Sequence, residues 1–180
     1  MSNIKYIYRT VDQLIDKYDT RDPFKICKDS DIHLYYTDLG SALKAYYFYQ
    51  SRIKNIVINS NAGSVVRRIL CAHELGHATL HGKMASMKGF RELGLFDSLI
   101  PTEYEANLFA AELIISDEDL LNLLEESDGS LFSIASELYV PFELLDFKLK
   151  IMKTKGHNVN VPCISASDFL KRDITGGIYD

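Results

Sequence analysis

An H-E-x-x-H string inside an apolar, helix-periodic segment constrains the fold of this chain more than any other feature. The string runs from His73 to His77, within residues 65–81, where apolar residues and histidines recur at three- and four-residue steps. Residues four apart share one face of a helix, so His73 and His77 can direct two imidazoles at one metal ion. Glu74 is offset by about 100° and can reach a water molecule without being a ligand. The alternative is a buried helix whose histidines make only core hydrogen bonds.

A zinc ion that keeps one position open for water needs a third protein ligand, and the candidate lies on a second predicted helix. This helix opens at Pro101 and contains the string E-Y-E-A-N-L-F-A-A-E-L at 103–113. Glu103 and Asn107 share a face, so Glu103 is predicted to bind the metal and Asn107 to hydrogen-bond a ligand histidine. Glu105 lies about 200° from Glu103 and is the weaker candidate. Either glutamate could instead complement the helix dipole.

The two strings together resemble those of the ImmA/IrrE family of zinc metallopeptidase-like proteins. The resemblance runs from Ile56 to about Ile115. It departs from the family pattern at Ser116, where a proline is usual, and this position touches a helix exit and no ligand. The resemblance implies a zincin-like fold, a Zn²⁺ cofactor and a metallopeptidase site in the cytoplasm.

The function implied by the resemblance is zinc-dependent cleavage of one specific protein. The substrate would be a transcriptional repressor, a DNA-binding protein of a mobile element or stress operon. His73, His77 and Glu103 would hold the zinc, and Glu74 would move a proton from water to the leaving amine. One alternative is a regulatory or toxin–antitoxin-like module that uses the same zinc fold to bind a transcription regulator without general proteolysis. Another is a metal-free structural helix pair.

The other segments predict an α+β fold with a helical C-terminal region. Helices are expected at 10–19 and 22–28 and strands at 31–37, 43–49 and 55–59. The strands would form a small, mainly antiparallel sheet packed on the H-E-x-x-H helix. Thr10 is the expected cap of the first helix, and Ser60 or Asn61 that of the H-E-x-x-H helix. The strand at 43–49 could be an edge that pairs with an extended substrate.

The chain is expected to divide into three parts. Residues 1–115 would be the metallopeptidase core, 116–155 a helical extension packed on it, and 156–180 a C-terminal tail. In the extension, a helix is expected to start at Ser116, and two more would cover 130–139 and 141–153. The connection at 83–100 could be a lid or a loop tucked over the core.

Charge and composition limit the partners. With 25 acidic and 20 basic residues the net charge is −5, so direct nucleic-acid binding is not expected. The tight joint between the last two helices would suit a helix-turn-helix, but the second mixes acidic residues with Lys148, Lys150 and Lys153, which indicates a solvated face. No run approaches the length of a membrane helix, and the N-terminus lacks an apolar secretory core, so a cytoplasmic protein is expected.

Two side chains near the string are not expected to bind the metal. Cys71 would point to a different face of the helix, and the three widely spaced cysteines are typical of a reduced protein. His81 lies one turn past His77, but three ligands in a row would span about 11 Å, too far for one zinc ion. We therefore expect His81 to interact with the C-terminal end of its own helix.

Overall fold

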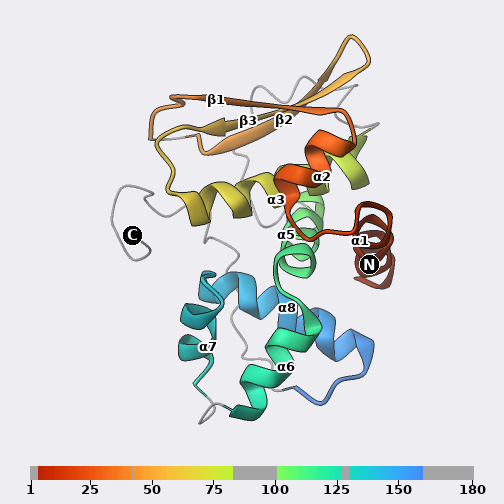
Figure 1. Ribbon diagram of the computed structural model, residues 1–180, viewed down its shortest axis with the longest axis vertical. Coiled ribbons are helices and arrows are strands. Elements are labelled where there is room, and N and C mark those ends of the chain that lie inside the picture. The colour runs from red at the N-terminus through yellow and green to blue at the C-terminus, as the bar shows by residue number, and fades with distance from the viewer. Residues whose placement is uncertain (1–3, 42, 83–100, 127–129, 160–180) are drawn as a thin grey trace.

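A three-stranded sheet lies at one end of the fold, and the helices extend away from one of its faces (Figure 1). The computed structural model describes residues 4–41, 43–82, 101–126 and 130–159. The strands are β1 (Ile32–Thr37), β2 (Ala45–Gln50) and β3 (Ile53–Asn59). Their order is β1-β3-β2, with β3 parallel to β1 and antiparallel to β2. The α+β class is as predicted, but the sheet is mixed, where mainly antiparallel pairing was expected.

The most apolar strand takes the centre of the sheet, which explains the difference in pairing. Ile56, Val57 and Ile58 of β3 are all buried, as is usual for a strand with neighbours on both sides. A two-residue turn at Ser51 and Arg52, both with positive φ, joins β2 to β3 as a hairpin. The chain therefore leaves β1, forms β2 at the outside and returns to place β3 between them. Among the described residues β2 is an edge strand, as considered above for 43–49.

Helix α5 (Pro101–Ile114) is the central helix of the fold (Figure 1). It packs against α1 (Ile4–Tyr18), α3 (Ser64–Leu80) and α8 (Phe142–Lys155). Every residue from 106 to 114 is buried, which is typical of a helix surrounded on all sides. Its C-terminal end is satisfied by Arg21, whose guanidinium donates to the Glu112 carbonyl at 2.8 Å. The α3 helix, which carries the H-E-x-x-H string, lies between α5 and strands β2 and β3.

Two predicted helix starts were wrong. The first helix begins at Ile4, because its buried stripe starts ahead of Thr10 with Ile7. Thr10 is therefore inside α1, where its hydroxyl donates to the Tyr6 carbonyl at 2.8 Å. Helix α3 begins at Ser64 after Gly63, so neither Ser60 nor Asn61 caps it. By contrast, α2 (Pro23–Asp29) begins as expected, with the Asp22 carboxylate accepting from the Phe24 N–H at 3.0 Å.

The C-terminal helical region is as predicted. It comprises α6 (Asp117–Glu126), α7 (Leu131–Glu137) and α8, and the Ser116 hydroxyl accepts from the Asp119 N–H at 3.0 Å. One hydrophobic cluster includes residues from Ile7 to Met152, on both sides of the expected boundary at 115. The division into core, extension and tail stays a prediction. The connection at 83–100 and the tail beyond Val159 lie outside the described residues. No described helix is long and apolar enough to span a membrane.

A group of four charges, two of them fully buried, joins α5, α6 and α8. The Lys148 ammonium lies 2.7 Å from the Glu112 carboxylate, and both side chains are fully buried. Lys155 binds Glu112 at 2.5 Å and Asp117 at 2.7 Å, and Lys148 also contacts Asp117. The prediction that Lys148 lies on a solvated face was therefore wrong. Buried charges are tolerated when they are paired, and here two lysines neutralise two carboxylates.

We expect Lys148→Met to lower the free energy of unfolding by about 3 kcal/mol, because it leaves the Glu112 carboxylate buried with one partner fewer. Urea denaturation of the purified protein measures this change. Lys153→Met is the matched control, since Lys153 is exposed on the same helix and its loss should stay within about 0.5 kcal/mol. Equal stability of the two variants would show that the buried charges contribute little.

Candidate metal centre

Helices α3 and α5 bring the three predicted ligand side chains together. His73 and His77 extend from successive turns of α3, and Glu103 from the first turn of α5. The two histidine Nε2 atoms are 3.1 Å apart. Glu103 Oε2 lies 3.3 Å from His73 Nε2, and Glu103 Oε1 lies 3.3 Å from His77 Nε2. In the described part of the chain, this is the group of histidine and carboxylate side chains with the geometry to hold a metal ion.

The three distances are those expected between ligand atoms of one zinc ion, with a different Glu103 oxygen facing each histidine. Zinc bonds to histidine nitrogen and carboxylate oxygen of about 2.0–2.2 Å place neighbouring ligand atoms about 3.4 Å apart. The observed separations are 3.1, 3.3 and 3.3 Å. In addition, the buried Oε2 atoms of Glu74 and Glu103 have no hydrogen-bond partner among the described residues. Unpaired buried oxygens are costly unless a cation or water completes them, so these residues fit a small divalent ion with one open position.

The charges of the three side chains are strongly coupled. Burial alone would raise the pKa of Glu103, but the adjacent imidazoles of His73 and His77 lower it to about 2. Burial also lowers the pKa of His77, to about 4, so this imidazole is neutral at pH 7. For His73, burial acts to lower the pKa, but the adjacent Glu103 and Glu74 carboxylates and the Asn107 amide outweigh it, so the pKa is raised. Glu103 is therefore ionised at neutral pH and offers an anionic oxygen to a cation bound between it and the two imidazoles.

Asn107 orients one of the two histidines. Its Oδ1 lies 2.9 Å from His73 Nδ1, and both side chains are buried. An amide oxygen only accepts, so His73 Nδ1–H is the donor, and in the neutral ring the Nε2 lone pair faces Glu103 and His77. This is the contact predicted for Asn107 from its position one turn after Glu103. Such contacts fix the tautomer that can bind a metal.

Glu74 lies between α3 and β2, beside the candidate ligands His73, His77 and Glu103, which we call the ligand group. Its side chain is buried, and the backbone N–H of Tyr47 in β2 donates to its carboxylate. Burial raises the pKa of Glu74 to about 7; the charge on Glu103 acts in the same direction and His73 opposes it. A carboxyl group with a pKa near neutrality can both accept and release a proton at physiological pH. Glu74 is therefore suited to proton transfer next to the metal position.

Gly76 allows the two helices to approach closely. A Cβ atom at this position would lie 3.2 Å from three atoms of the Phe109 side chain, which is fully buried on α5. A side chain here would force Phe109 or its helix to shift by a few tenths of an ångström, which glycine avoids. Sequence reasoning missed this role, because it depends on which α5 residue faces the middle of the H-E-x-x-H string. The contact sets the separation across which Glu103 reaches the histidines.

We expect Gly76→Val to destabilise the protein by about 1–3 kcal/mol, because the extra methyl groups overlap a well-packed core. The same change should weaken zinc binding, since it separates α5 from α3. Thermal unfolding and a zinc competition titration test both effects. Ser64→Val, at an exposed position of the same helix, serves as the control for an added valine. Wild-type zinc affinity in a destabilised Gly76→Val protein would contradict a role for this contact in the metal centre.

His81 and Glu105 meet behind His77, a contact that the sequence did not reveal. His81 ends α3, where its N–H donates to the His77 carbonyl at 2.9 Å. That backbone bond would form with any residue at this position, and the predicted interaction of the His81 side chain with the helix end stays a prediction. The His81 ring lies between two side chains: its Nδ1 is 3.2 Å from His77 Nδ1, and its Nε2 is 2.9 Å from Glu105 Oε2. Glu105 does not join the ligand group. The contact requires the ends of α3 and α5 to be adjacent, which local patterns do not specify.

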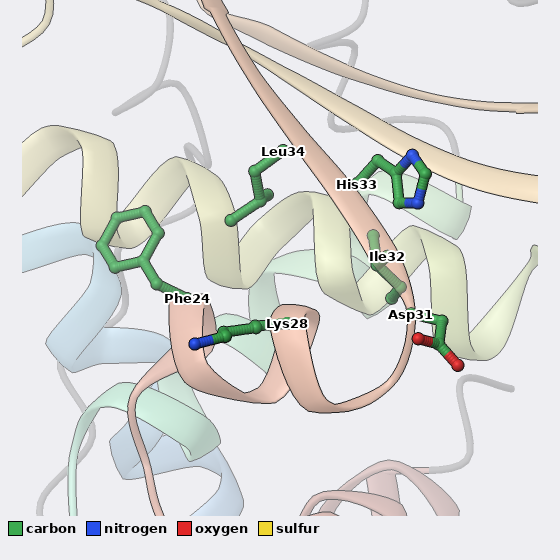
Figure 2. A pocket seen from close by; sticks show the side chains of 6 residues that line it. All are labelled: Phe24, Lys28, Asp31, Ile32, His33 and Leu34. Carbon is green, nitrogen blue, oxygen red and sulfur yellow. The ribbon is translucent and has the colours of Figure 1, made fainter.

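Two other features lie away from the centre. Cys71 contacts Cys27, with 3.8 Å between sulfur atoms; this hydrogen bond and burial raise the pKa of the Cys71 thiol. A groove of about 440 Å³ lies between α2 and the start of β1. Figure 2 shows its lining side chains: Phe24, Lys28, Asp31, Ile32, His33 and Leu34. None of them belongs to the ligand group, so the groove is not part of the candidate centre.

The chain is similar to known proteins along most of its length. A family model described as the IrrE N-terminal-like domain, from the M78 peptidases, matches residues 27–150, which include every residue of the centre. The chain is 37% identical over 142 residues to uncharacterized immunity region protein 2 of Bacillus phage phi105, covering 79% of this chain and 88% of that protein. It is 31% identical over 164 residues to metallopeptidase ImmA of Bacillus subtilis (strain 168), covering 90% of this chain and 95% of that protein.

Proposed function

Because the chain belongs to the IrrE N-terminal-like family of M78 peptidases, we propose that it is a zinc-dependent endopeptidase with a narrow protein substrate. The observation that carries the proposal is the convergence of His73, His77 and Glu103 with a buried Glu74 beside them. Two imidazoles and one carboxylate form a typical ligand set for a catalytic zinc ion with an open fourth position. Glu74 is on the same helix but outside this set, where a general base is needed.

In this proposal each side chain has a distinct task. A zinc ion held by His73, His77 and Glu103 would supply Lewis acidity, which acidifies a water molecule and polarises the scissile carbonyl. Glu74 accepts the proton of that water and donates it to the leaving amine, a task that suits its pKa of about 7. Asn107 holds His73 in the tautomer whose Nε2 is free to bind.

Strand β2 is the proposed site of substrate pairing. In the described sheet β2 lies at the edge, and the N–H of its Tyr47 already donates to Glu74. An extended peptide that adds to this edge through main-chain hydrogen bonds would lie next to the proton-transfer group. This arrangement would place one peptide bond of the substrate close to Glu74 and the ligand group.

The proposed substrate is a repressor-type DNA-binding protein. The support comes from the two relatives, one named as an immunity region protein of a phage and the other as metallopeptidase ImmA. The net charge of −5 also favours a basic partner over direct contact with nucleic acid. A repressor acts in the cytoplasm, so we propose that this protein acts there too.

The test begins with a search for a repressor-like protein encoded beside this chain's gene. Purified repressor, incubated with zinc-loaded protein, should be cut at one position, detected by mass spectrometry of the products. A chelator should stop the cleavage, and added zinc should restore it. If the repressor binds tightly but stays intact, and if Glu74→Gln protein still inactivates it in cells, the alternative of a binding module without proteolysis replaces the peptidase proposal.

A further inference from the structure

The side chains of His77, His81 and Glu105 form a hydrogen-bonded series that ends at the protein surface. From His77 Nδ1 it is 3.2 Å to His81 Nδ1, and from His81 Nε2 it is 2.9 Å to Glu105 Oε2. The two histidines are buried, whereas the Glu105 side chain is 28% exposed. The rings of His77 and His81 lie 5.4 Å apart between centroids and are inclined by 53°.

We propose that His81 and Glu105 are positioning residues that hold His77 in its metal-binding tautomer. The inference rests on the proposed function, because it assumes that His77 is a ligand through Nε2. It assigns the pair no contact with substrate or metal. Asn107 contacts Nδ1 of His73 directly. Glu105 acts on Nδ1 of His77 in the same way, but through His81.

The direction of both hydrogen bonds in the series His77–His81–Glu105 follows from counting donors and acceptors. An ionised carboxylate only accepts, so His81 Nε2 carries the proton that is shared with Glu105. A neutral imidazole has one N–H, so His81 Nδ1 is then an acceptor. The neighbouring His77 Nδ1 must therefore be the donor. His77 is left with its lone pair on Nε2, the atom that lies 3.3 Å from Glu103 Oε1.

The position of the pair in the fold supports this role. Glu103 is in the first turn of α5 and Glu105 follows two residues later, so the two side chains leave the helix in different directions. The Glu103 carboxylate contacts the Nε2 atoms of His73 and His77. The Glu105 carboxylate contacts His81, which in turn contacts Nδ1 of His77. Because His81 is also held by its own N–H to the His77 carbonyl at 2.9 Å, its ring stays beside the ring that it orients.

Two substitutions of His81 separate hydrogen bonding from packing. His81→Leu fills much of the same space but removes the acceptor, whereas the Oδ1 atom of His81→Asn can take the place of the imidazole Nδ1. Loss of a residue that hydrogen-bonds a metal-ligating histidine typically weakens metal binding by about 10–100-fold, and we expect this for His81→Leu. We expect His81→Asn to stay within about 5-fold of wild type, because an acceptor remains. The zinc affinity of Glu105→Leu should lie between those of His81→Leu and His81→Asn.

The first readout is zinc affinity, measured by competition with a chromophoric chelator on full-length protein. The second is the tautomer of His77, measured by ¹⁵N NMR of the imidazoles, which should report a proton on Nδ1 in wild type and mixed tautomers in His81→Leu. His33→Leu is the matched control, since His33 is exposed on β1 and should change neither readout. Circular dichroism shows which variants fold, and Glu105→Leu replaces His81→Leu if the latter does not.

The outcomes separate this inference from the proposed function. If wild type binds zinc but His81→Leu and His81→Asn lose affinity equally, or neither loses any, the pair is only structural and the inference is wrong, while the peptidase proposal stands. If wild type does not bind zinc, the proposed function fails. The NMR of the metal-free protein then decides the inference by itself: a proton on His77 Nδ1 that depends on His81 supports it, and its absence overturns it.

Discussion

Glu74→Gln should leave zinc bound at wild-type stoichiometry and lower the cleavage rate of the substrate by about 10²–10⁴-fold, the range for losing a general acid–base group. Glutamine has nearly the same shape as glutamate but cannot accept a proton at neutral pH. Glu74 is outside the group formed by His73, His77 and Glu103, so the ligand geometry should survive. We therefore expect Glu74→Gln protein to bind zinc fully and to cleave almost no substrate.

Initial cleavage rates and the zinc content of the same samples measure this effect. Glu118→Gln is the matched control, because Glu118 is exposed on α6 and the same chemical change there should not alter the rate. Cleavage by Glu74→Gln at the wild-type rate would mean that another group moves the proton. Loss of zinc from this variant would instead show that Glu74 is a ligand.

Glu103→Ala should abolish tight zinc binding, and with it all peptidase activity. The substitution removes the carboxylate that contacts both histidine Nε2 atoms at 3.3 Å and leaves only two ligands. The loss of affinity should exceed the roughly 10–100-fold typical of residues that only hydrogen-bond a ligand. It should therefore be larger than the effect of His81→Leu in the same titration.

Isothermal titration of metal-free protein with zinc measures this loss, with Glu118→Ala as the control for removing an exposed glutamate. Glu105 was the other candidate for the third ligand, and it lies on His81 instead. If Glu103→Ala binds zinc as wild type does, while Glu105→Leu does not, the assignment of these two glutamates must be reversed. The ligand group described above would then not be the metal site.

The ion pairs of α5 connect the candidate centre to the C-terminal helices. Glu103 reaches α3 from one end of the helix, and Glu112 pairs with Lys148 and Lys155 of α8 near the other. Helix α5 is buried along most of its length, so its position depends on both sets of contacts. The C-terminal helices therefore help to place Glu103, although none of them contributes a side chain to the ligand group.

Much of the local structure could be predicted because it depends on spacing along the chain. The separation of His73 and His77 is one helical turn, so any helix through them places both imidazoles on one side. Glu103 and Asn107 are related in the same way on α5, which is why their contacts with the histidines were predictable. The lengths of the strands and of the last three helices follow from apolar periodicity of the same kind.

The remaining features depend on how elements distant in sequence meet, and only the tertiary structure decided them. The insertion of β3 between β1 and β2, the fit of Gly76 against Phe109 and the burial of Lys148 all arise from packing between elements. The contact of His81 with Glu105 belongs to the same class. Periodicity specifies which face of a helix a residue occupies, but the neighbour of that face is set by the packing of the whole core. The sequence by itself therefore determined which side chains are the candidate ligands, and the fold determined what holds them in place.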